Sequence, residues 1–405
     1  MLYWIAVAGH SLKDTLLIIR LNRLAHLPPA QNMAEILLDR GVDCRVAQLG
    51  SHELTAQEPC PTFTLHLPLL AWFGPLRPIL LCLYSAGALV RKIRRNGRPK
   101  LLVAHGILEQ IVAFCVGTIL KIPYLVHVHE IYDPADLSPV NRLFLSLERF
   151  CLRQAKYLIF PGNERRNIYV TRYQLHQSIF VIPNCPRLRE LRGGTLPFLV
   201  PAESRVMSYV GGIGDDNAIV EGVIAASQIP GLHFAIAGWS DRPYRRLIEE
   251  AAKRFGVEDR VHLLGPIRGE AKWKLLEASD LTLCVYKPAN LRMRCNATPS
   301  NKLFESMAAG KPMVGGISPD FRAFLTENRV GLFVDSGEPG ALSAAIQKIL
   351  ENPKGAKAMG AEGYRLHRER FNYETQLKPL IEALSALFPA LSHRPAEAPP
   401  QTLSP

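Results

Sequence analysis

The stretch "ATPSNKLFESMAAGKPMV", residues 297–314, is the most informative part of the chain. Ser300 suits the N-cap of a helix that ends at Gly310. At 100° per residue, the apolar side chains share one face, whereas Lys302 and Glu305 lie one turn apart on the opposite, non-core face. The free N–H groups at the helix start could bind phosphate oxygens, and Glu305 could accept hydrogen bonds from a ribose diol. A surface Lys–Glu ion pair is the alternative interpretation.

Short apolar runs flank this helix, and the same alternation of strand and helix patterns continues through the chain. Expected strands are 3–8, 44–49, 101–105, 124–129, 157–160, 178–183, 205–212, 232–238, 260–265, 281–286, 312–316 and 331–335, with helices between them, for example around 107–120 and 140–155. Strands that alternate with helices predict parallel sheets covered by helices. The fold class is therefore α/β.

A stretch rich in proline and glycine, 184–204, divides this pattern into two halves. We expect an N-terminal Rossmann-like domain over 1–195, a second over 203–375, a C-terminal helix over 376–390 and a disordered, proline-rich tail over 391–405. Two such domains place a cleft between the carboxyl ends of two sheets, where ligands bind. This architecture suggests an enzyme with two substrates, one for each half.

The composition favours a cytosolic protein with an anionic partner. The chain has 405 residues, a net charge of +12 and eight scattered cysteines without a CxxC pair. Reduced core thiols are the simplest interpretation of these cysteines, and no zinc site is visible. The basic residues are not interleaved with aromatic ones, so nucleic acid is not the expected partner. Anionic lipid and sugar nucleotides remain.

The segment 67–90 contains one charge, Arg77, and is followed by six basic residues in "RKIRRNGRPK". Three prolines in its first half argue against a regular membrane-spanning helix. Contact with an anionic membrane surface is one interpretation. A core helix with a solvated basic end is the other. The N-terminus lacks the features of a signal peptide and resembles a first strand.

The stretch "PSNKLFESMAAGKPMV" resembles the donor-site motif of the family 4 glycosyltransferases, which are retaining enzymes of the GT-B fold. The resemblance extends, in chain order, to "YLVHVHE" (124–130), "VIPNCP" (181–186), "RVHLLGPI" (260–267), "EASDLTLCVY" (277–286) and "VGLFVDSGEPGALSAAIQKILEN" (330–352). It covers most of the C-terminal half and is patchier in the first half. It implies a GT-B fold of two Rossmann-like domains that face each other across a cleft.

The resemblance also implies roles for individual residues. Glu305 would bind the donor ribose, and Ser300 and Lys302 would hold the diphosphate. Gly9, Gly211 and Gly212 would let the backbone approach the substrates closely.

His129 would lie near the transferred sugar as a catalytic residue. We expect His127 to face the opposite way from His129 on the same strand, and His105 to be structural.

Three departures from the family pattern stand out. The family often has a second glutamate eight residues before the first, but Ala297 is found there. The stretch "GGIGDDNAIVEG" (211–222) has two aspartates where the family has an arginine and a lysine for the diphosphate. Lys302, with Lys287, Arg292 or Arg294, would then meet the phosphate charge. The first loop reads "AGHS" rather than Gly-Gly.

The expected function is that of a retaining, hexosyltransferase-type glycosyltransferase. It would move a sugar from a UDP- or GDP-type nucleotide sugar to a saccharide or polyprenyl-linked acceptor in cell-surface polysaccharide biosynthesis. No Asp-x-Asp motif is present, so we expect no cofactor and metal-independent transfer. The expected location is cytoplasmic, with peripheral contact at the inner face of the plasma membrane. A catalytically inactive GT-B scaffold that binds nucleotide sugar or a partner enzyme is the alternative.

Overall fold

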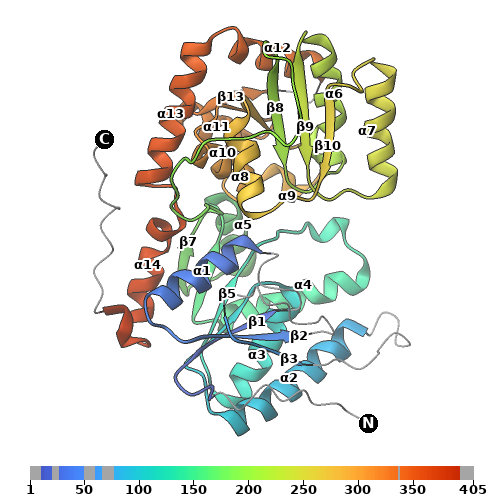
Figure 1. The fold of residues 1–405 in the computed structure, drawn as a ribbon. Helices are drawn as coiled ribbons and strands as arrows, with labels where there is room; N and C mark the ends of the chain where they lie inside the picture. Colours follow the sequence, from blue (N-terminus) through green and yellow to red (C-terminus); the bar gives the residue numbers. More distant parts are fainter. Residues whose placement is uncertain (1–10, 21–26, 50–59, 66–76, 336–337, 393–405) are drawn as a thin grey trace. The chain divides into compact units, whose positions relative to one another are not determined.

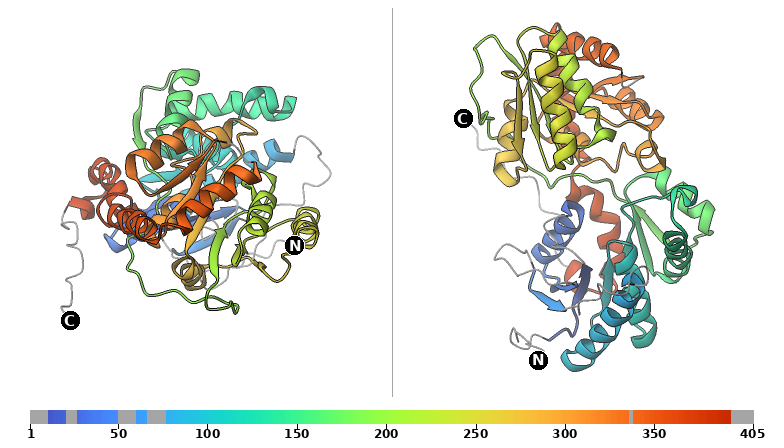
Figure 2. Two further views of the ribbon diagram at one scale, coloured as in Figure 1. Left: turned by 90° about the horizontal axis from the view of Figure 1, so that it is seen from above. Right: turned by 90° about the vertical axis from the view of Figure 1, so that its right-hand side faces the viewer.

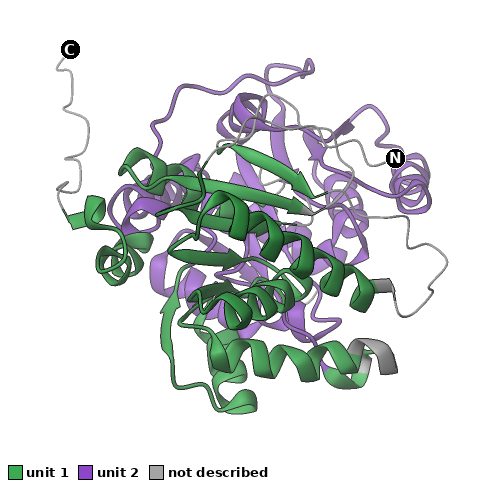
Figure 3. Cartoon of the chain, turned by 90° about the horizontal axis from the view of Figure 1, so that it is seen from below, with its two compact units in different colours: residues 1–130, 134–182, 376–405 green, residues 131–133, 183–375 purple. Residues whose placement is uncertain are grey.

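The computed structural model describes residues 11–20, 27–49, 60–65, 77–335 and 338–392. The chain divides into two units: unit 1 comprises 1–130, 134–182 and 376–405, and unit 2 comprises 131–133 and 183–375 (Figure 3). The division places 184–204, the expected linker, in unit 2, and groups the C-terminal segment with unit 1. The expected first strand, 3–8, and Gly9 lie outside the described residues.

Unit 1 is built on a seven-stranded parallel sheet with the order β3-β2-β1-β4-β5-β6-β7 (Figure 1). Its strands are β1 (Leu16–Arg20), β2 (Cys44–Leu49), β3 (Thr62–Leu65), β4 (Leu101–Ala104), β5 (Tyr124–His127), β6 (Tyr157–Phe160) and β7 (Ser178–Val181). Its helices are α1 (Pro28–Asp39), α2 (Arg77–Asn96), α3 (Ile107–Leu120), α4 (Pro139–Gln154) and α5 (Asn163–Tyr173). The strand order reverses between β1 and β4, which is where ligands bind in sheets of this kind.

The last helix, α14 (Tyr373–Ser385), contributes to the core of unit 1. Its side chains Leu380 and Leu384 are fully buried, and Phe388 beyond it is nearly so. The Tyr157 hydroxyl of β6 donates a hydrogen bond to the Ala383 carbonyl over 3.2 Å. Unit 1 is therefore assembled from two pieces of chain that are almost two hundred residues apart.

Unit 2 repeats the architecture with a six-stranded parallel sheet in the order β10-β9-β8-β11-β12-β13. Its strands are β8 (Arg205–Val210), β9 (Leu232–Ala237), β10 (Val261–Gly265), β11 (Leu281–Val285), β12 (Met313–Gly316) and β13 (Gly331–Val334). Its helices are α6 (Ile219–Gln228), α7 (Arg242–Arg254), α8 (Gly269–Ala278), α9 (Leu291–Arg294), α10 (Asn301–Ala308), α11 (Pro319–Asn328), α12 (Pro339–Leu350) and α13 (Pro353–Glu369). The order reverses between β8 and β11.

Alternation along the strands of unit 2 supplies hydrophobic side chains to cores on both faces of the sheet. Leu283 of β11 packs with α6, α7 and α12, whereas its neighbour Cys284 packs on the other face with α10 and α11. Figures 1 and 2 show α6 and α7 on one side of the sheet and α11 and α13 on the other. Both faces of the sheet are thus covered, as parallel sheets require.

The basic end predicted for the segment 67–100 lies in α2. Leu89 and Ile93 are buried, while Arg94 and Arg95 in the last turn are exposed. Residues 66–76 lie outside the described part, so contact of this segment with a membrane stays a prediction. Among the described helices, none combines the length and the apolar character needed to cross a bilayer.

Candidate active site

The start of α10 is anchored at the carboxyl end of β11. Ser300 is buried, and its hydroxyl accepts a hydrogen bond from the Leu303 N–H over 3.4 Å. The Tyr286 hydroxyl, one residue after β11, lies 2.7 Å from the Ser300 hydroxyl. The N-cap predicted from the sequence is therefore present, and it fixes the free N–H groups of α10 at the edge of the sheet where ligands bind.

Lys302 lies in the first turn of α10 between two aromatic rings. Its ammonium nitrogen is 4.9 Å from the centre of the Tyr209 ring and 4.6 Å from that of Tyr286. Such contacts hold a cation without neutralising it. Lys302 forms no ion pair with any residue in the described ranges. The lysine thus offers a full positive charge beside the N-terminus of α10.

Glu305 has a different partner from the one its position suggests. Its carboxylate lies 2.6 Å from the ammonium of Lys272 in α8, and both side chains are at least four-fifths buried. The prediction that Glu305 lies on a non-core face with Lys302 as its neighbour is therefore wrong. The Lys272 side chain of α8 contacts α10 on that face. The sequence did hold one indication of this pair: a carboxylate on a buried helix needs a cation, which can come from a residue far away in the chain.

The loop after β8 brings the backbone close to this site. A Cβ added to Gly211, which has φ +156°, would lie 3.0 Å from the Lys302 ammonium. A Cβ added to Gly212 would meet nothing within 4 Å, so this residue borders open space. Gly238 after β9 packs on the Gly211 carbonyl, and the Tyr209 hydroxyl donates to the Gly212 carbonyl. The sequence did not single out Gly238 or Tyr209.

The acidic residues that depart from the family pattern form ion pairs with basic residues after β11. The Lys287 ammonium lies 2.5 Å from Glu221 and 3.2 Å from Asp215. Arg292 lies 3.9 Å from Asp216. Burial opposes the charge of Lys287, but the two carboxylates prevail and raise its pKa. The cations considered for the diphosphate are thus held at this edge of the sheet, while Arg294 is exposed.

In unit 1, three histidines gather at the carboxyl ends of β4 and β5. The His105 Nδ1 lies 3.1 Å from the His129 Nε2, and the ring centres of His127 and His129 are 3.9 Å apart. The prediction that His127 and His129 face opposite ways is wrong, because residues two apart in an extended chain point to the same face. His105, which was expected to be structural, is a direct neighbour of His129.

The surroundings keep these imidazoles neutral. Burial lowers the pKa of His127 to about 3. Burial, the neighbouring histidines and Arg20 lower the pKa of His105 and of His129 as well. Arg20 lies 3.7 Å from the Glu109 carboxylate, and Arg165 donates to the His129 carbonyl. A neutral His129 can accept or donate a hydrogen bond, so it suits contact with a sugar hydroxyl.

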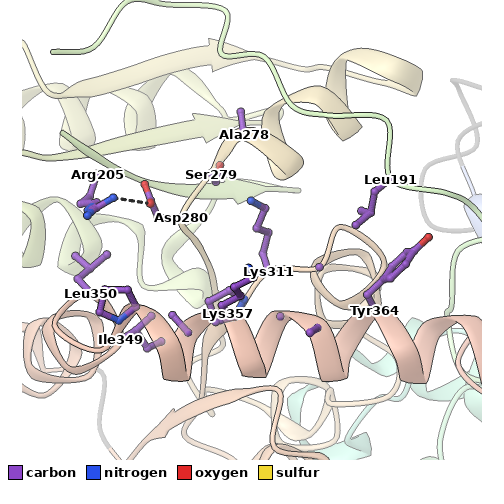
Figure 4. A pocket seen from close by; sticks show the side chains of 16 residues that line it. Leu191, Arg205, Ala278, Ser279, Asp280, Lys311, Ile349, Leu350, Lys357 and Tyr364 are labelled. Carbon is purple, nitrogen blue, oxygen red and sulfur yellow. Dashed lines mark hydrogen bonds and ion pairs between the residues drawn. The ribbon is translucent and has the colours of Figure 1, made fainter. Parts of the chain in front are cut away.

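A pocket of about 540 Å³ lies at the other edge of the unit 2 sheet (Figure 4). It is lined by the residues before β11 and β12, including Asp280 and Lys311, and by Lys357 and Tyr364 of α13. None of the residues predicted for the donor site lines this pocket. The candidate site is instead the carboxyl edge of the sheet, at β8, β11 and the start of α10.

Comparison with known sequences gives matches in both halves. The family described as "Glycosyltransferase Family 4" matches residues 30–187, and the family described as "Glycosyl transferase-like" matches residues 219–382. A D-inositol 3-phosphate glycosyltransferase of Segniliparus rotundus is 24% identical over 391 residues, covering 88% of this chain and 83% of the relative. The lipopolysaccharide core biosynthesis glycosyltransferase LpsD of Rhizobium meliloti is 24% identical over 42% of this chain and 47% of its own.

Solved structures share the fold over nearly the whole chain. Sucrose-phosphate synthase from Thermosynechococcus elongatus has a TM-score of 0.72 and 20% identity, with coverage of 93% of this chain and 100% of its own. HepE of Anabaena in complex with UDP-glucose has a TM-score of 0.70 and 18% identity; the match covers 92% of this chain and 100% of HepE. At these identities the likeness establishes the fold.

Proposed function

Since the chain belongs to the family 4 glycosyltransferases, sugar-transferring enzymes of the GT-B fold, we propose that it transfers a sugar with retention of configuration. The proposed donor is a UDP- or GDP-linked sugar. The proposed acceptor is a saccharide or a lipid-linked saccharide. One observation carries the proposal: the Lys302 ammonium has no carboxylate partner in the described ranges and lies at the N-terminus of α10 beside Gly211.

The donor diphosphate is assigned to the edge formed by α10 and the loop after β8. The N–H groups that follow Ser300, together with Lys302, stabilise the charge that develops on the leaving diphosphate as the glycosidic bond breaks. Gly212 leaves room for the phosphates to reach the backbone. HepE of Anabaena, which shares the fold, binds UDP and UDP-glucose, and this favours a uridine nucleotide.

Glu305 is assigned to the donor ribose and His129 to the transferred sugar. Lys272 fixes the orientation of the Glu305 carboxylate, and a fixed carboxylate oxygen can accept hydrogen bonds from a diol. Lys302 and the N–H groups at the start of α10 place positive charge at this edge of the sheet, whereas Lys287 and Arg292 already have acidic partners. We therefore propose transfer without a metal ion or cofactor.

The proposed setting is the assembly of a cell-surface polysaccharide at the inner face of the plasma membrane. LpsD of Rhizobium meliloti, a relative, acts in lipopolysaccharide core biosynthesis. On α4, Leu143 and Phe150 are 49% and 61% exposed and lie seven residues apart, which puts them on one face. Exposed apolar side chains beside Arg142 and Arg149 suit peripheral contact with an anionic membrane.

The first test is a thermal-shift and calorimetry panel of UDP-, GDP-, ADP- and CMP-linked sugars on the wild type and on Glu305→Ala. We expect one nucleotide to stabilise the wild type selectively and to lose this effect in the variant. Release of the nucleoside diphosphate in the presence of acceptor then reports transfer. Selective binding without any turnover would favour the inactive scaffold, and binding that ignores Glu305 would reject the site assignment.

A further inference from the structure

Two of the three clustered histidines have no role in the proposed transfer. Neither ring nitrogen of His127, which is fully buried, has a hydrogen-bond partner in the described part of the chain. The Nε2 of His105 also lacks one there. A buried polar atom without a partner costs free energy, on the order of 1–3 kcal/mol. Such atoms call for a ligand that the imidazoles would bind together.

The geometry of the cluster matches the needs of a small cation. One ring nitrogen from each of His105, His127 and His129 can be chosen so that all lie within 4.8 Å of one another. A zinc ion with Zn–N distances of about 2.1 Å in tetrahedral geometry holds its ligand nitrogens about 3.4 Å apart. The His105 and His129 nitrogens are already 3.1 Å apart. Ring rotations that bring the third nitrogen, that of His127, from at most 4.8 Å to about 3.4 Å from the other two would complete the site.

We propose that His105, His127 and His129 form a binding site for a transition-metal ion of the zinc class. Three imidazoles favour zinc, copper, nickel or cobalt over magnesium or calcium, which prefer oxygen ligands. Three protein ligands leave a fourth coordination position open. His129 is partly exposed whereas His105 and His127 are buried, so the ion enters from the His129 side.

The neighbouring charges make this site moderate in affinity and reversible. Arg20 and Arg165 lie close enough to the histidines to repel a dication. Glu109, 3.7 Å from Arg20, offsets part of that repulsion. The geometry therefore assigns a site that fills when the free metal concentration rises.

Occupancy of the site and sugar transfer are mutually exclusive, a conclusion that rests on the proposed function. The ion enters from the His129 side and presents its open fourth coordination position there, so it competes with the transferred sugar for the exposed side of His129 even where the second ring nitrogen stays free. The metal thus acts as an inhibitor, and transfer itself needs none. Chelation leaves the activity unchanged or raises it, whereas added zinc lowers it.

The binding test uses the full chain without a polyhistidine tag, stripped with EDTA and titrated with zinc chloride by calorimetry. We expect one zinc per wild-type chain and at least a tenfold weaker affinity in His105→Asn and in His127→Asn. The matched control is His262→Asn. His262 lies in unit 2, where its Nε2 is 3.0 Å from the His233 Nδ1; within the described ranges this pair has no third histidine beside it, so the variant is expected to bind zinc as the wild type does.

Cobalt substitution gives a readout independent of activity. Bound Co²⁺ is expected to give the absorption bands of a tetrahedral site in the wild type and in His262→Asn, and to lose them in His127→Asn. Thermal unfolding confirms that each variant is folded, and His127→Gln replaces His127→Asn if that variant does not fold. Zinc that fails to bind the wild type, or that binds the His127 variants equally well, overturns the site.

The inhibition test expresses each rate relative to the same variant without zinc. Zinc is expected to inhibit the wild type and His262→Asn, and to inhibit His127→Asn at least tenfold less strongly. Inhibition that persists in His127→Asn overturns the competition between metal and sugar. If no variant transfers sugar, the proposed function fails, while the calorimetric and cobalt experiments still decide the metal site.

Discussion

Lys302 has the features that the proposed donor site requires of a single residue. Its ammonium is fixed by two tyrosine rings and by the close approach of Gly211, yet no carboxylate of the described chain neutralises it. Lys287, by contrast, already has two acidic partners. The two lysines lie at the same edge of the sheet, but they differ in how much charge they can offer to a diphosphate.

We expect Lys302→Ala to weaken binding of the free nucleoside diphosphate by about tenfold to a hundredfold, because charge-assisted contacts to phosphate are lost. The measurement is calorimetry with UDP and GDP. Lys357→Ala is the matched control, since Lys357 is an exposed lysine of unit 2 that lines the pocket at the opposite edge. Equal affinity in wild type and Lys302→Ala would remove the lysine from the donor site.

Glu148 of α4 provides a prediction for pH dependence. The carboxyl is buried, accepts hydrogen bonds from Tyr169 and Tyr173, and has a pKa that burial raises to about 7. The unfolded chain ionises near pH 4.5. The folded state holds the proton of Glu148 more tightly than the unfolded chain does. The stability that the protonated carboxyl contributes is therefore lost as the pH rises toward and through 7.

Ionisation of Glu148 should therefore lower the free energy of unfolding by about 2–3 kcal/mol as the pH rises from 5 to 8. Glu148→Gln cannot titrate, so its stability should change less over this range than that of the wild type. Urea unfolding of both proteins at the two pH values measures the difference. Parallel pH profiles would show that the carboxyl ionises normally.

At the scale of elements, two glycines that follow neighbouring strands, Gly238 after β9 and Gly212 after β8, have opposite requirements. A Cβ at Gly238, which has φ +159°, would lie 1.7 Å from the Gly211 carbonyl oxygen, whereas a Cβ at Gly212 would meet nothing within 4 Å. The first glycine serves packing of the loop. The second borders the space assigned to the donor.

Gly238→Ala is expected to destabilise the protein by about 2 kcal/mol or more, because backbone and carbonyl must both shift. Gly212→Ala should leave stability within about 0.5 kcal/mol of the wild type and weaken nucleotide binding through the added methyl group. Thermal unfolding and calorimetry on both variants separate the two effects. A nucleotide affinity unchanged in Gly212→Ala would place the phosphates elsewhere.

The elements also show what the sequence could predict. β6 and α3 have the predicted bounds, because each is a bounded apolar segment with a clear period. Two strands were not predicted, β1 ("LLIIR") and β3 ("TFTL"). β1 is a short apolar segment that ends in an arginine, and β3 is a half-buried strand at the edge of the sheet, so each gives a weak sequence pattern. At the site, Ser300 and Lys302 could be found from local spacing. Lys272 and Gly238 could not, because only tertiary packing brings them to the site.

At the scale of the whole molecule, unit 2 is an insertion in unit 1. The chain leaves unit 1 after Ile182 and returns at Gln376. A fragment of residues 183–375 contains every strand and core cluster of unit 2. We expect this fragment to fold cooperatively and to bind the same nucleoside diphosphate as the full chain, as measured by thermal unfolding and calorimetry. A fragment that folds but binds no nucleotide would show that the donor site needs residues of unit 1.

The same insertion sets the order in which the protein can mature on the ribosome. The α14 segment, which contributes to the core of unit 1, is synthesised after unit 2. Unit 1 therefore cannot complete its core until 193 residues beyond Ile182 have been added. At a translation rate of 5–20 residues per second, this delay is roughly 10–40 s. During that time the apolar surface that later receives Leu380, Leu384 and Phe388 has no partner. We therefore expect the nascent chain to benefit from a chaperone that shields this surface, and unit 2 to be complete before unit 1.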